Sequence, residues 1–474
     1  MQLSETKYRK LGSIAAGLSA LSANLLSANA AHAQDASAPQ NTEAHLPGLM
    51  DEPAPGAGSV VLDSSVLFYQ ETGGRVQAIE PVINGEVHLD NGDVISGGLT
   101  YDSLTGATPN GAAPSTGRQT FSSIIRQATS TQVTSTSASG NSTVTSIPGT
   151  TTANSVYTQP ARAIPLASFH DHRVAANLTY NWQADADTHV KLGGAFSVES
   201  DYTTFTGSTG ISRDFNQKNT TLSLSASIEG DISRPHGGTP TAYENLNTLV
   251  TGGNDHKTVI NVVGGVTQTL TRFWLTQLNY NYSTSSGYQA DPYRLISVVD
   301  NSGAPLAYLF ESRPRSRQRH SFYWGNKLAL GPTVADIGVR YYTDSWGIKG
   351  ITAEVSEQVP INRYLYVKPL FRYYKQSAAN FYEPYLISQS GATTFSGLPA
   401  YASSDARLSR FSATTIGGRI GWRLFEDSEL YVEGESYRQA GTHTIAGAPG
   451  QLAGLDFFSG VHAISVMMGF KIKM

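Results

Sequence analysis

Charged side chains recur at every second position of several apolar segments, and this spacing limits the chemistry they can do. Alternate residues of an extended strand lie on one face, so these side chains would share the face opposite the apolar ones. In a water-filled lumen they would filter solutes by charge, whereas in a closed lumen they would form ion pairs that hold the strands together. Both interpretations stay open for these residues: Glu80, Glu86, Arg173, Lys191, Glu199, Glu229, Asp336, Arg340, Lys368, Arg372, Arg419, Glu433, Glu435 and Lys471.

Four arginines form a second charged pattern. They occupy alternate positions before and within a predicted strand, at Arg313, Arg315, Arg317 and Arg319. One interpretation is a contact with an anionic solute or with lipopolysaccharide at the outer rim. We favour the other interpretation, a solvated rim, because charge runs at the ends of elements usually face water.

Metal-binding patterns are weak. His170-Asp171-His172 could place two histidines on one strand face, but two ligands do not make a site, and a polar strand entrance is the simpler interpretation. The stretch from Asp102 to Gly111 is rich in oxygen atoms, yet it offers one carboxylate where Ca²⁺ would need several. We therefore predict a structured turn there, no metal site and no cofactor.

The sequence shows no catalytic constellation. It contains no Gly-x-Ser-x-Gly elbow, no His-Glu-x-x-His helix and no phosphate-binding Walker loop. A lipid hydrolase on a barrel wall would need a Ser–His pair on one face, but His320 and Ser321 are adjacent and would point to opposite faces. We therefore do not expect an enzyme.

Extended strands with a period of two would position these residues. In the last segment Ile464, Val466, Met468, Phe470 and Ile472 alternate with mostly small or charged residues, which is typical of a strand in a membrane barrel. The same pattern predicts about sixteen strands, within roughly 14 to 18. They are 59–70, 75–89, 93–103, 172–183, 187–203, 206–215, 218–231, 256–269, 272–284, 317–330, 334–346, 350–359, 364–375, 410–423, 429–440 and 461–473.

Loop lengths support a barrel independently. If the first strand starts on the periplasmic side, every connection on that side is short, whereas the long connections fall on the other side, as is typical of bacterial barrels. Barrels of about this size usually leave an aqueous channel. Aromatic residues near the strand ends would form girdles at the lipid boundary: Trp182, Trp274, Tyr280, Tyr282, Trp324, Tyr366, Tyr373 and Trp422.

The N-terminus predicts export. Lys7, Arg9 and Lys10 precede an apolar stretch that ends in the small-x-small sequence Ala31-His32-Ala33, as in a secretory signal peptide. The chain has no cysteine and a net charge of −4, which excludes disulfides and argues against nucleic acid as a partner.

The chain therefore divides into a signal peptide at 1–33, a flexible periplasmic leader at 34–58 and a barrel at 59–474. Its first outer loop, 104–171, is unusual, because 19 of the 37 residues from 122 to 158 are Ser or Thr and only one is charged. Such a segment cannot bury a core, so we expect it to be disordered or loosely folded.

Three stretches carry a family resemblance. They are DSLTGATPNGA at 102–112, RDFNQKNTTLSL at 213–224 and DPYRLISVVD at 291–300, and VLFYQE and RVQAIEPVI occur near the start of the barrel. In these motifs the chain resembles the uncharacterised bacterial family catalogued as domain of unknown function 3570 (DUF3570). The resemblance implies an envelope barrel and no particular chemistry. The last strand also resembles the C-terminal signal of barrel assembly, although it ends in Met474 with Phe470 four residues earlier.

The sequence thus predicts an all-β protein, a transmembrane, antiparallel, up-and-down β-barrel in the outer membrane of a Gram-negative bacterium. We expect a porin-like pore or transport component. The alternatives are a non-conducting envelope barrel that anchors or assists a partner and, with less support, a lipid-acting barrel enzyme. The expected partners are outer-membrane lipid, lipopolysaccharide, the barrel-assembly machinery during insertion and an unknown envelope protein.

Overall fold

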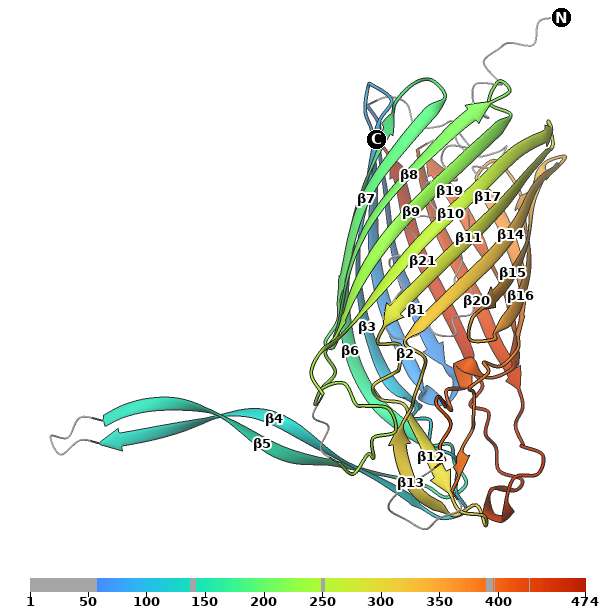
Figure 1. The fold of residues 1–474 in the computed structure, drawn as a ribbon. Coiled ribbons are helices and arrows are strands. Elements are labelled where there is room, and N and C mark those ends of the chain that lie inside the picture. Colours follow the sequence, from blue (N-terminus) through green and yellow to red (C-terminus); the bar gives the residue numbers. More distant parts are fainter. Residues whose placement is uncertain (1–57, 137–141, 249–251, 389–394, 396, 426) are drawn as a thin grey trace, which may run out of the picture.

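The computed structural model describes residues 58–136, 142–248, 252–388, 395, 397–425 and 427–474 (Figure 1). The signal peptide predicted at 1–33 and nearly all of the leader predicted at 34–58 lie outside these residues. No helix in the described part of the chain is long and apolar enough to cross a bilayer.

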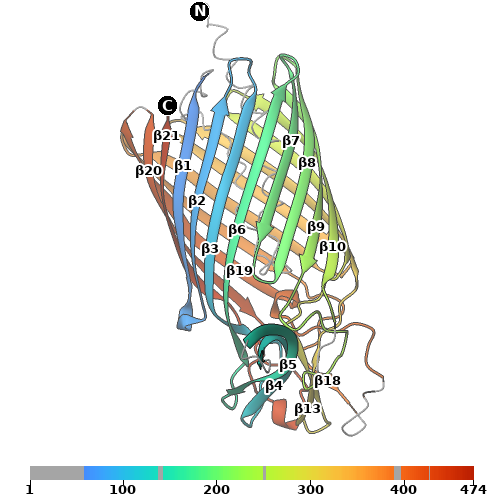
Figure 2. The ribbon, with the colours of Figure 1, turned by 90° about the vertical axis from the view of Figure 1, so that its left-hand side faces the viewer.

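Antiparallel strands close into a barrel in which each strand pairs with its neighbours along the chain and β21 pairs with β1 (Figures 1 and 2). The sixteen barrel strands are β1 Val60–Glu71, β2 Val76–His88, β3 Val94–Pro109, β6 Leu166–Gln183, β7 Thr188–Val198, β8 Tyr202–Phe215, β9 Thr220–Ser233, β10 Asp255–Thr271, β11 Trp274–Gly287, β14 Ser316–Leu330, β15 Thr333–Asp344, β16 Lys349–Pro360, β17 Leu365–Gln376, β19 Phe411–Phe425, β20 Ser428–Gly441 and β21 His462–Lys473.

The predicted fold is confirmed, and each predicted strand corresponds to one barrel strand. The main difference is at β3 and β6, which extend beyond the predicted ends at 103 and 172. Residues Leu104–Pro109 pair with Leu166–Asp171, so the two strands support each other where neither segment alternates clearly. The β8 strand, whose sequence pattern is the least regular, pairs along its length with β7 and β9.

The connections sort by length as predicted. Those at one end, which we call the short-turn end, are tight. One of them passes through Gly92 at a φ of 88°, and another through Asn216, Gln217 and Lys218, all at positive φ, where a left-handed backbone closes the turn. Both described ends of the chain lie at this end of the barrel (Figure 1), where the amide of Val60 donates to the carbonyl of Met474 at 2.9 Å.

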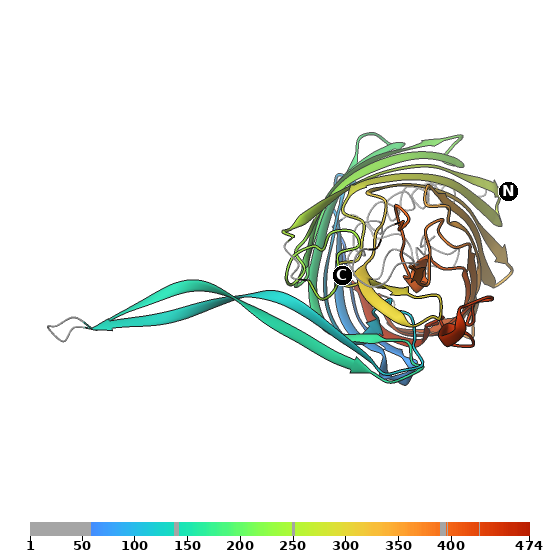
Figure 3. The ribbon, with the colours of Figure 1, turned by 60° about the horizontal axis from the view of Figure 1, so that its bottom comes forward.

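The opposite end, which we call the long-loop end, carries the buried apolar clusters of the described chain. Three short strands, β12 Leu295–Val299, β13 Pro305–Phe310 and β18 Leu386–Ile387, form a separate sheet there. Single-turn 3-10 helices lie at Thr72–Gly74, Ala406–Leu408 and Gly450–Leu452. We call the described residues of the loops 234–254, 288–315 and 377–410, with this sheet, the cap. In Figures 1 and 3 the β12–β13 pair lies across the long-loop end.

The Ser/Thr-rich part of loop 104–171 forms a long hairpin of β4 Gln119–Thr136 and β5 Ser142–Gln159. It projects sideways from the long-loop end in Figures 1 and 3. The expectation of a disordered or loosely folded segment is therefore wrong for its described residues. Thr and Val favour an extended backbone, and Phe121 anchors the base by stacking on Tyr157 at 5.1 Å and packing on Tyr308 at 4.6 Å.

Candidate functional site

The barrel wall has an apolar outer face. Large apolar side chains stand exposed at alternate positions of each strand, among them Leu178 on β6 at 62%, Ile228 on β9 at 57% and Ile416 on β19 at 63%. A continuous belt of such residues would be unfavourable in water, whereas it matches the hydrocarbon of a bilayer. The outer face is therefore that of a membrane-spanning barrel.

Most of the predicted girdle residues lie on this outer face. Trp182, Trp274, Trp324 and Trp422 are all 39% exposed or more. Tyr366 is a correction, because it alternates with the outward residues of β17 and is 9% exposed. Its hydroxyl instead donates to a Glu429 carboxylate oxygen at 2.7 Å inside the barrel.

The charged residues predicted to line the lumen stand on the inner face, since on every strand they alternate with the exposed apolar ones. That they line a solute pathway stays a prediction. The residues on the inner face are Glu80, Glu86, Arg173, Lys191, Glu229, Asp336, Arg340, Arg372, Arg419, Glu433 and Glu435.

Neighbouring strands bring several of these charges together on β14 to β17. One carboxylate oxygen of Asp336 lies 3.6 Å from Lys327 Nζ, and the other lies 3.4 Å from Lys368 Nζ. Arg372 Nε lies 3.1 Å from a Glu354 oxygen. Sequence reasoning missed Lys327 and Glu354, although the alternation within their segments could have revealed both.

Ion pairs also link other parts of the inner wall. Arg419 lies 2.8 Å from Glu433. Arg173 contacts Asp102 at 2.5 Å and Glu80 at 3.5 Å. The sequence predicts a turn from Asp102 onward, whereas in the structure Asp102 is an inward residue of β3. The inner wall is thus polar and laced with ion pairs, which both an open and a closed lumen would allow.

Two further pairs of interacting residues lie on the inner face, one on β9 and β10 and the other on β2. Lys257 Nζ is 3.0 Å from Asp231, whose neighbour Glu229 is 4% exposed. Glu86 accepts from His88 Nε2 at 2.5 Å near the short-turn end.

The four-arginine row is divided among three environments. The expected solvated rim is wrong for Arg313, whose fully buried side chain lies in the cap, and for Arg317, which pairs with Asp344 at 2.7 Å and stacks on Trp346 at 4.1 Å. Arg315 fits the expectation, with a side chain 68% exposed. The carboxylates come from Glu311, two residues before Arg313, and from Asp344 and Asp405, which lie further along the chain.

The cap has an apolar core of its own. Ile296, Val298, Leu309 and Ala402 are at most 1% exposed and pack together with Leu386. Sequence reasoning treated these segments as plain loops. The run Leu295–Val299, with its β-branched residues between polar flanks, was the signal that could have predicted a buried strand.

Six ionisable side chains form a network in the cap. Arg313 contacts Glu311 at 2.7 Å and Asp405 at 2.8 Å, and Arg407 bridges Asp405 at 2.5 Å to Asp291 at 3.1 Å. Arg294 adds a contact to Asp291 at 3.3 Å. Every carboxylate therefore faces at least one guanidinium group, as burial of charge requires.

The protonation equilibria of these carboxyls follow from their surroundings. Burial alone would raise the pKa of Asp291, but Arg294 and Arg407 outweigh it and hold that pKa at about 2. The pKa of Asp405 is likewise lowered well below its usual value, because three arginines outweigh burial. Burial raises the pKa of Glu311 despite Arg313.

Two of the family motifs meet in the cap. The amide of Leu295 donates to the carbonyl of Asn110 at 2.7 Å, and the amide of Ala113 donates to Ser297 Oγ at 2.9 Å. Gly111 has a φ of +92°, and a Cβ there would lie 2.3 Å from the carbonyl oxygen of Leu295. The turn after β3 is thus fitted against β12.

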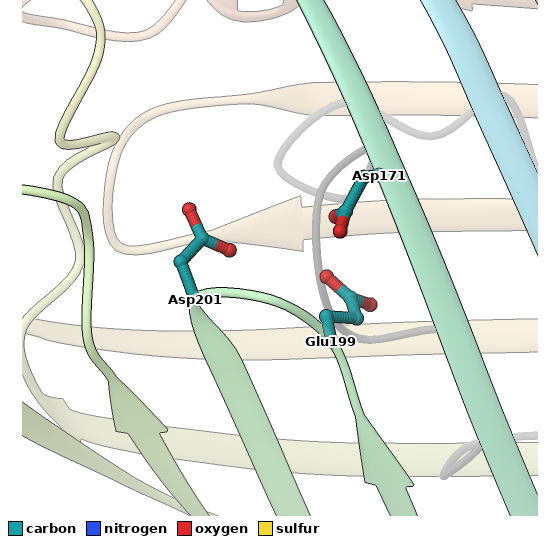
Figure 4. A group of neighbouring side chains, drawn as sticks. All are labelled: Asp171, Glu199 and Asp201. Carbon is teal, nitrogen blue, oxygen red and sulfur yellow. The ribbon is translucent and has the colours of Figure 1, made fainter.

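Three carboxylates gather where β6 meets the turn between β7 and β8 (Figure 4). Oxygens of Asp171, Glu199 and Asp201 lie within 4.8 Å of one another, a spacing that could hold a cation. Ser200 Oγ donates to Asp171 at 2.6 Å, and Tyr293 donates to Asp201 at 2.7 Å.

The predicted His170-Asp171-His172 pattern does not form one ligand set. The two imidazole rings pack edge to face at 4.5 Å on the outward positions of β6, where Tyr101 bonds His172 at 2.9 Å. Asp171 points to the other face of the strand and joins the acidic cluster.

Comparisons with known proteins give a family and a set of distant barrels. The family described as "Protein of unknown function (DUF3570)" matches residues 25–472, and no curated protein matches the chain. The siderophore receptor PirA from Pseudomonas aeruginosa is similar over 88% of this chain at 10% identity and a TM-score of 0.36, and the chain spans only 63% of that receptor.

Two other solved structures are shorter than that receptor. A bacterial polysaccharide outer membrane secretin is 7% identical at a TM-score of 0.40, over 88% of this chain and 99% of the secretin. The toluene transporter TodX from Pseudomonas putida is 11% identical at a TM-score of 0.32, over 87% of this chain and 88% of the transporter.

Proposed function

Since the chain belongs to the DUF3570 family, whose description assigns no function, we propose from its geometry that it is a pore or transport component of the bacterial outer membrane. The observation that supports this most is the division of its wall into an apolar outer face and a charged inner face on a closed barrel of sixteen strands. Barrels of this size leave room for an aqueous channel, and the lumen charges are of the kind that select solutes.

We propose that the cap controls the access of solutes to the pore at the long-loop end. Its sheet lies across the long-loop end (Figure 3), and its buried ion pairs fix the loops in one arrangement. Solutes would pass beside the cap or after it loosens. The same features favour a second candidate, a non-conducting envelope barrel whose cap and projecting β4–β5 hairpin engage a partner.

Conductance in planar lipid bilayers distinguishes the two candidates. The refolded full-length protein should give discrete conductance steps, whereas repeated insertion without current would contradict a pore. The variant Asp405→Asn leaves Arg313 and Arg407 without their shared carboxylate, and loss of one partner of a buried pair costs roughly 3–5 kcal/mol. We therefore expect it to open more often than the native protein.

A matched control removes a carboxylate from an exposed pair of the same end. Asp456 pairs with His443 at 3.0 Å, and both side chains are more than half exposed, so Asp456→Asn should leave the open fraction unchanged. Equal currents from Asp405→Asn and the native protein would show that the cap does not gate the mouth.

A further inference from the structure

The outer face of the barrel carries a group of cations near its long-loop end. Lys349 on β16, Lys375 on β17 and Arg438 on β20 are exposed and lie at outward positions of their strands. Arg410, directly before β19, is exposed as well. We call these four residues the outer basic patch. Their strands follow one another in the barrel order as β16, β17, β19 and β20, so the four cations share one part of the outer wall.

The strand register places the cations of the patch at a similar height. Lys375 lies opposite Ser412 on β19, and Arg438 lies opposite Thr414 on the same strand. Because β19 separates them, the two cations stand about 10 Å apart across the wall. Only the short hydroxyl side chains of Ser412 and Thr414 lie between them on the outward face of β19, which leaves room for a polar headgroup.

The outer basic patch borders the apolar belt of the barrel. Ile351, two residues after Lys349, is 47% exposed, and Tyr373, two residues before Lys375, is 38% exposed. On β19 the next outward residue beyond Thr414 is Ile416. A molecule bound here would therefore meet cations on one side and hydrocarbon-facing side chains on the other.

Outward carboxylates do not balance this charge. Among the described residues of the sixteen barrel strands, Glu357 is the only carboxylate at an outward position. It lies eight residues beyond Lys349 on β16, toward the short-turn end, where its carboxylate accepts from Thr333 Oγ1 at 2.8 Å. The long-loop half of the outer face thus carries cations and no carboxylate on the described strands.

The carboxylates of adjoining elements are held elsewhere, on the inner face, in the cap or in the loop after β20. They are Glu71, Asp344, Glu354, Glu433 and Glu435 on the inner face, Asp291, Glu311, Glu383 and Asp405 in the cap, and Asp456 in the loop after β20. In the described part of the chain, none of them forms an ion pair or a hydrogen bond with a cation of the patch. The patch is therefore available to an external anion.

We propose that the outer basic patch binds the phosphate groups of lipopolysaccharide, with the acyl chains of that lipid lying on the apolar belt. The long loops of bacterial barrels face the outside, so the patch lies at the outer leaflet, where lipopolysaccharide resides. Lysine and arginine donate charge-assisted hydrogen bonds to phosphate oxygens. The proposal goes beyond the pore function and does not rest on it, because the patch lies outside the lumen.

The row from Arg313 to Arg319, for which the sequence suggested the same contact, does not supply the site. Arg313 and Arg317 are buried and paired with carboxylates. The contact with lipopolysaccharide is instead assigned to cations on four separate strands, which only the closed barrel brings together.

Two forms of lipid A test the proposal, one with both phosphates and one from which the phosphates have been removed. Each is titrated into the full-length protein in detergent, and bound lipid is counted by native mass spectrometry. The native protein should bind the phosphorylated form at least about tenfold more tightly. Equal affinity for the two forms would overturn the proposal, because the acyl chains alone would then account for binding.

The double variant Lys375→Gln/Arg438→Gln should weaken binding of phosphorylated lipid A at least about tenfold and leave binding of the dephosphorylated form unchanged. The exchange Lys375→Arg/Arg438→Lys keeps both charges and should retain the native affinity. Each single substitution should give a smaller loss in the same direction, so the test holds even if the double variant does not fold. Unchanged binding in the Gln variants would refute the patch.

Arg213→Gln is the matched control, since Arg213 is an exposed outward arginine of β8 near the short-turn end. It should leave binding of lipid A unchanged, and a loss equal to that of the double variant would overturn the assignment to the patch. Phosphatidylglycerol separates the two sources of lipid phosphate. Equal affinity for it and for phosphorylated lipid A would overturn the assignment to lipopolysaccharide in favour of anionic lipids in general.

Discussion

Arg313 shows how strongly a residue's role depends on distant segments. Its guanidinium group contacts Glu311, two residues earlier, and Asp405, which follows much later in the chain. None of the three side chains is more than 2% exposed. Such a pair contributes stability only while both partners stay ionised and in place, so the cap depends on the charge of its aspartates.

The cap should loosen in acid within a defined pH window. In the folded state the pKa of Asp291 is lowered to about 2 and that of Asp405 is lowered well below its ordinary value. Both contributions are therefore complete above the ordinary aspartate pKa of about 3.9, and that of Asp291 is lost as the pH falls through about 2. Glu311 adds no slope in this window, because its raised pKa keeps it protonated in the folded cap, as it mostly is in the unfolded chain below its ordinary pKa of about 4.3.

Trp346 reports this change. It is 2% exposed and packs on Phe381 and Leu408 of the cap. The other four tryptophans are outward and at least 39% exposed. Its fluorescence should stay constant from pH 8 to 5 and shift to longer wavelength between about pH 4 and 2. A shift that begins above pH 5, or one that persists in Trp346→Phe, would contradict this assignment.

At the scale of the element, a barrel strand has one face toward the hydrocarbon of the bilayer and the other toward the lumen. On β11, Leu278 is outward and 52% exposed, while its neighbour Asn279 alternates with it on the inner face. Every backbone group in the bilayer must pair within the sheet, which fixes the register and hence the face of each side chain.

Arginine substitutions at these two neighbours should therefore differ. Leu278→Arg places a charge in hydrocarbon and should cost roughly 2–4 kcal/mol of unfolding free energy near the bilayer centre. Asn279→Arg places the same charge in the lumen and should cost clearly less. Urea titrations in lipid vesicles measure both values, and equal losses would show that the alternation does not separate lipid from lumen.

The local alternation made the strands predictable, but not their full lengths. The inner-face position of Glu80, Arg340 or Glu433 follows from its parity within its own strand. The extension of β3 to Pro109 does not, because residues 104–109 become a strand only through pairing with β6. The partners of Lys327 and Arg372 likewise depend on register between neighbouring strands.

At the scale of the whole molecule, the hairpin β4–β5 is independent of barrel closure. It forms its own two-stranded sheet, and the barrel order passes directly from β3 to β6. Its base alone is tied to the cap, through Phe121, Tyr157 and Tyr308.

Shortening the hairpin should leave the barrel intact. Replacing residues 124–154 by a two-residue turn keeps Ser123 and Ser155, which are opposite each other in register, as well as the aromatic base. The variant should retain the heat-dependent shift in gel mobility of the native barrel and melt within a few degrees of it. Loss of folding would mean that the outer part of the hairpin contributes to assembly.

The sequence by itself determined the barrel, its approximate strand number and the inner-face position of charged strand residues such as Glu80, Arg340 and Glu433, because a period of two is a property of each strand alone. Only the tertiary structure decided the rest. The buried network of Asp291, Arg313 and Asp405 joins segments far apart in the chain, and the ion pairs on the inner face of β14 to β17 depend on the register of four strands. Contacts between segments depend on how the chain closes, which no local pattern encodes.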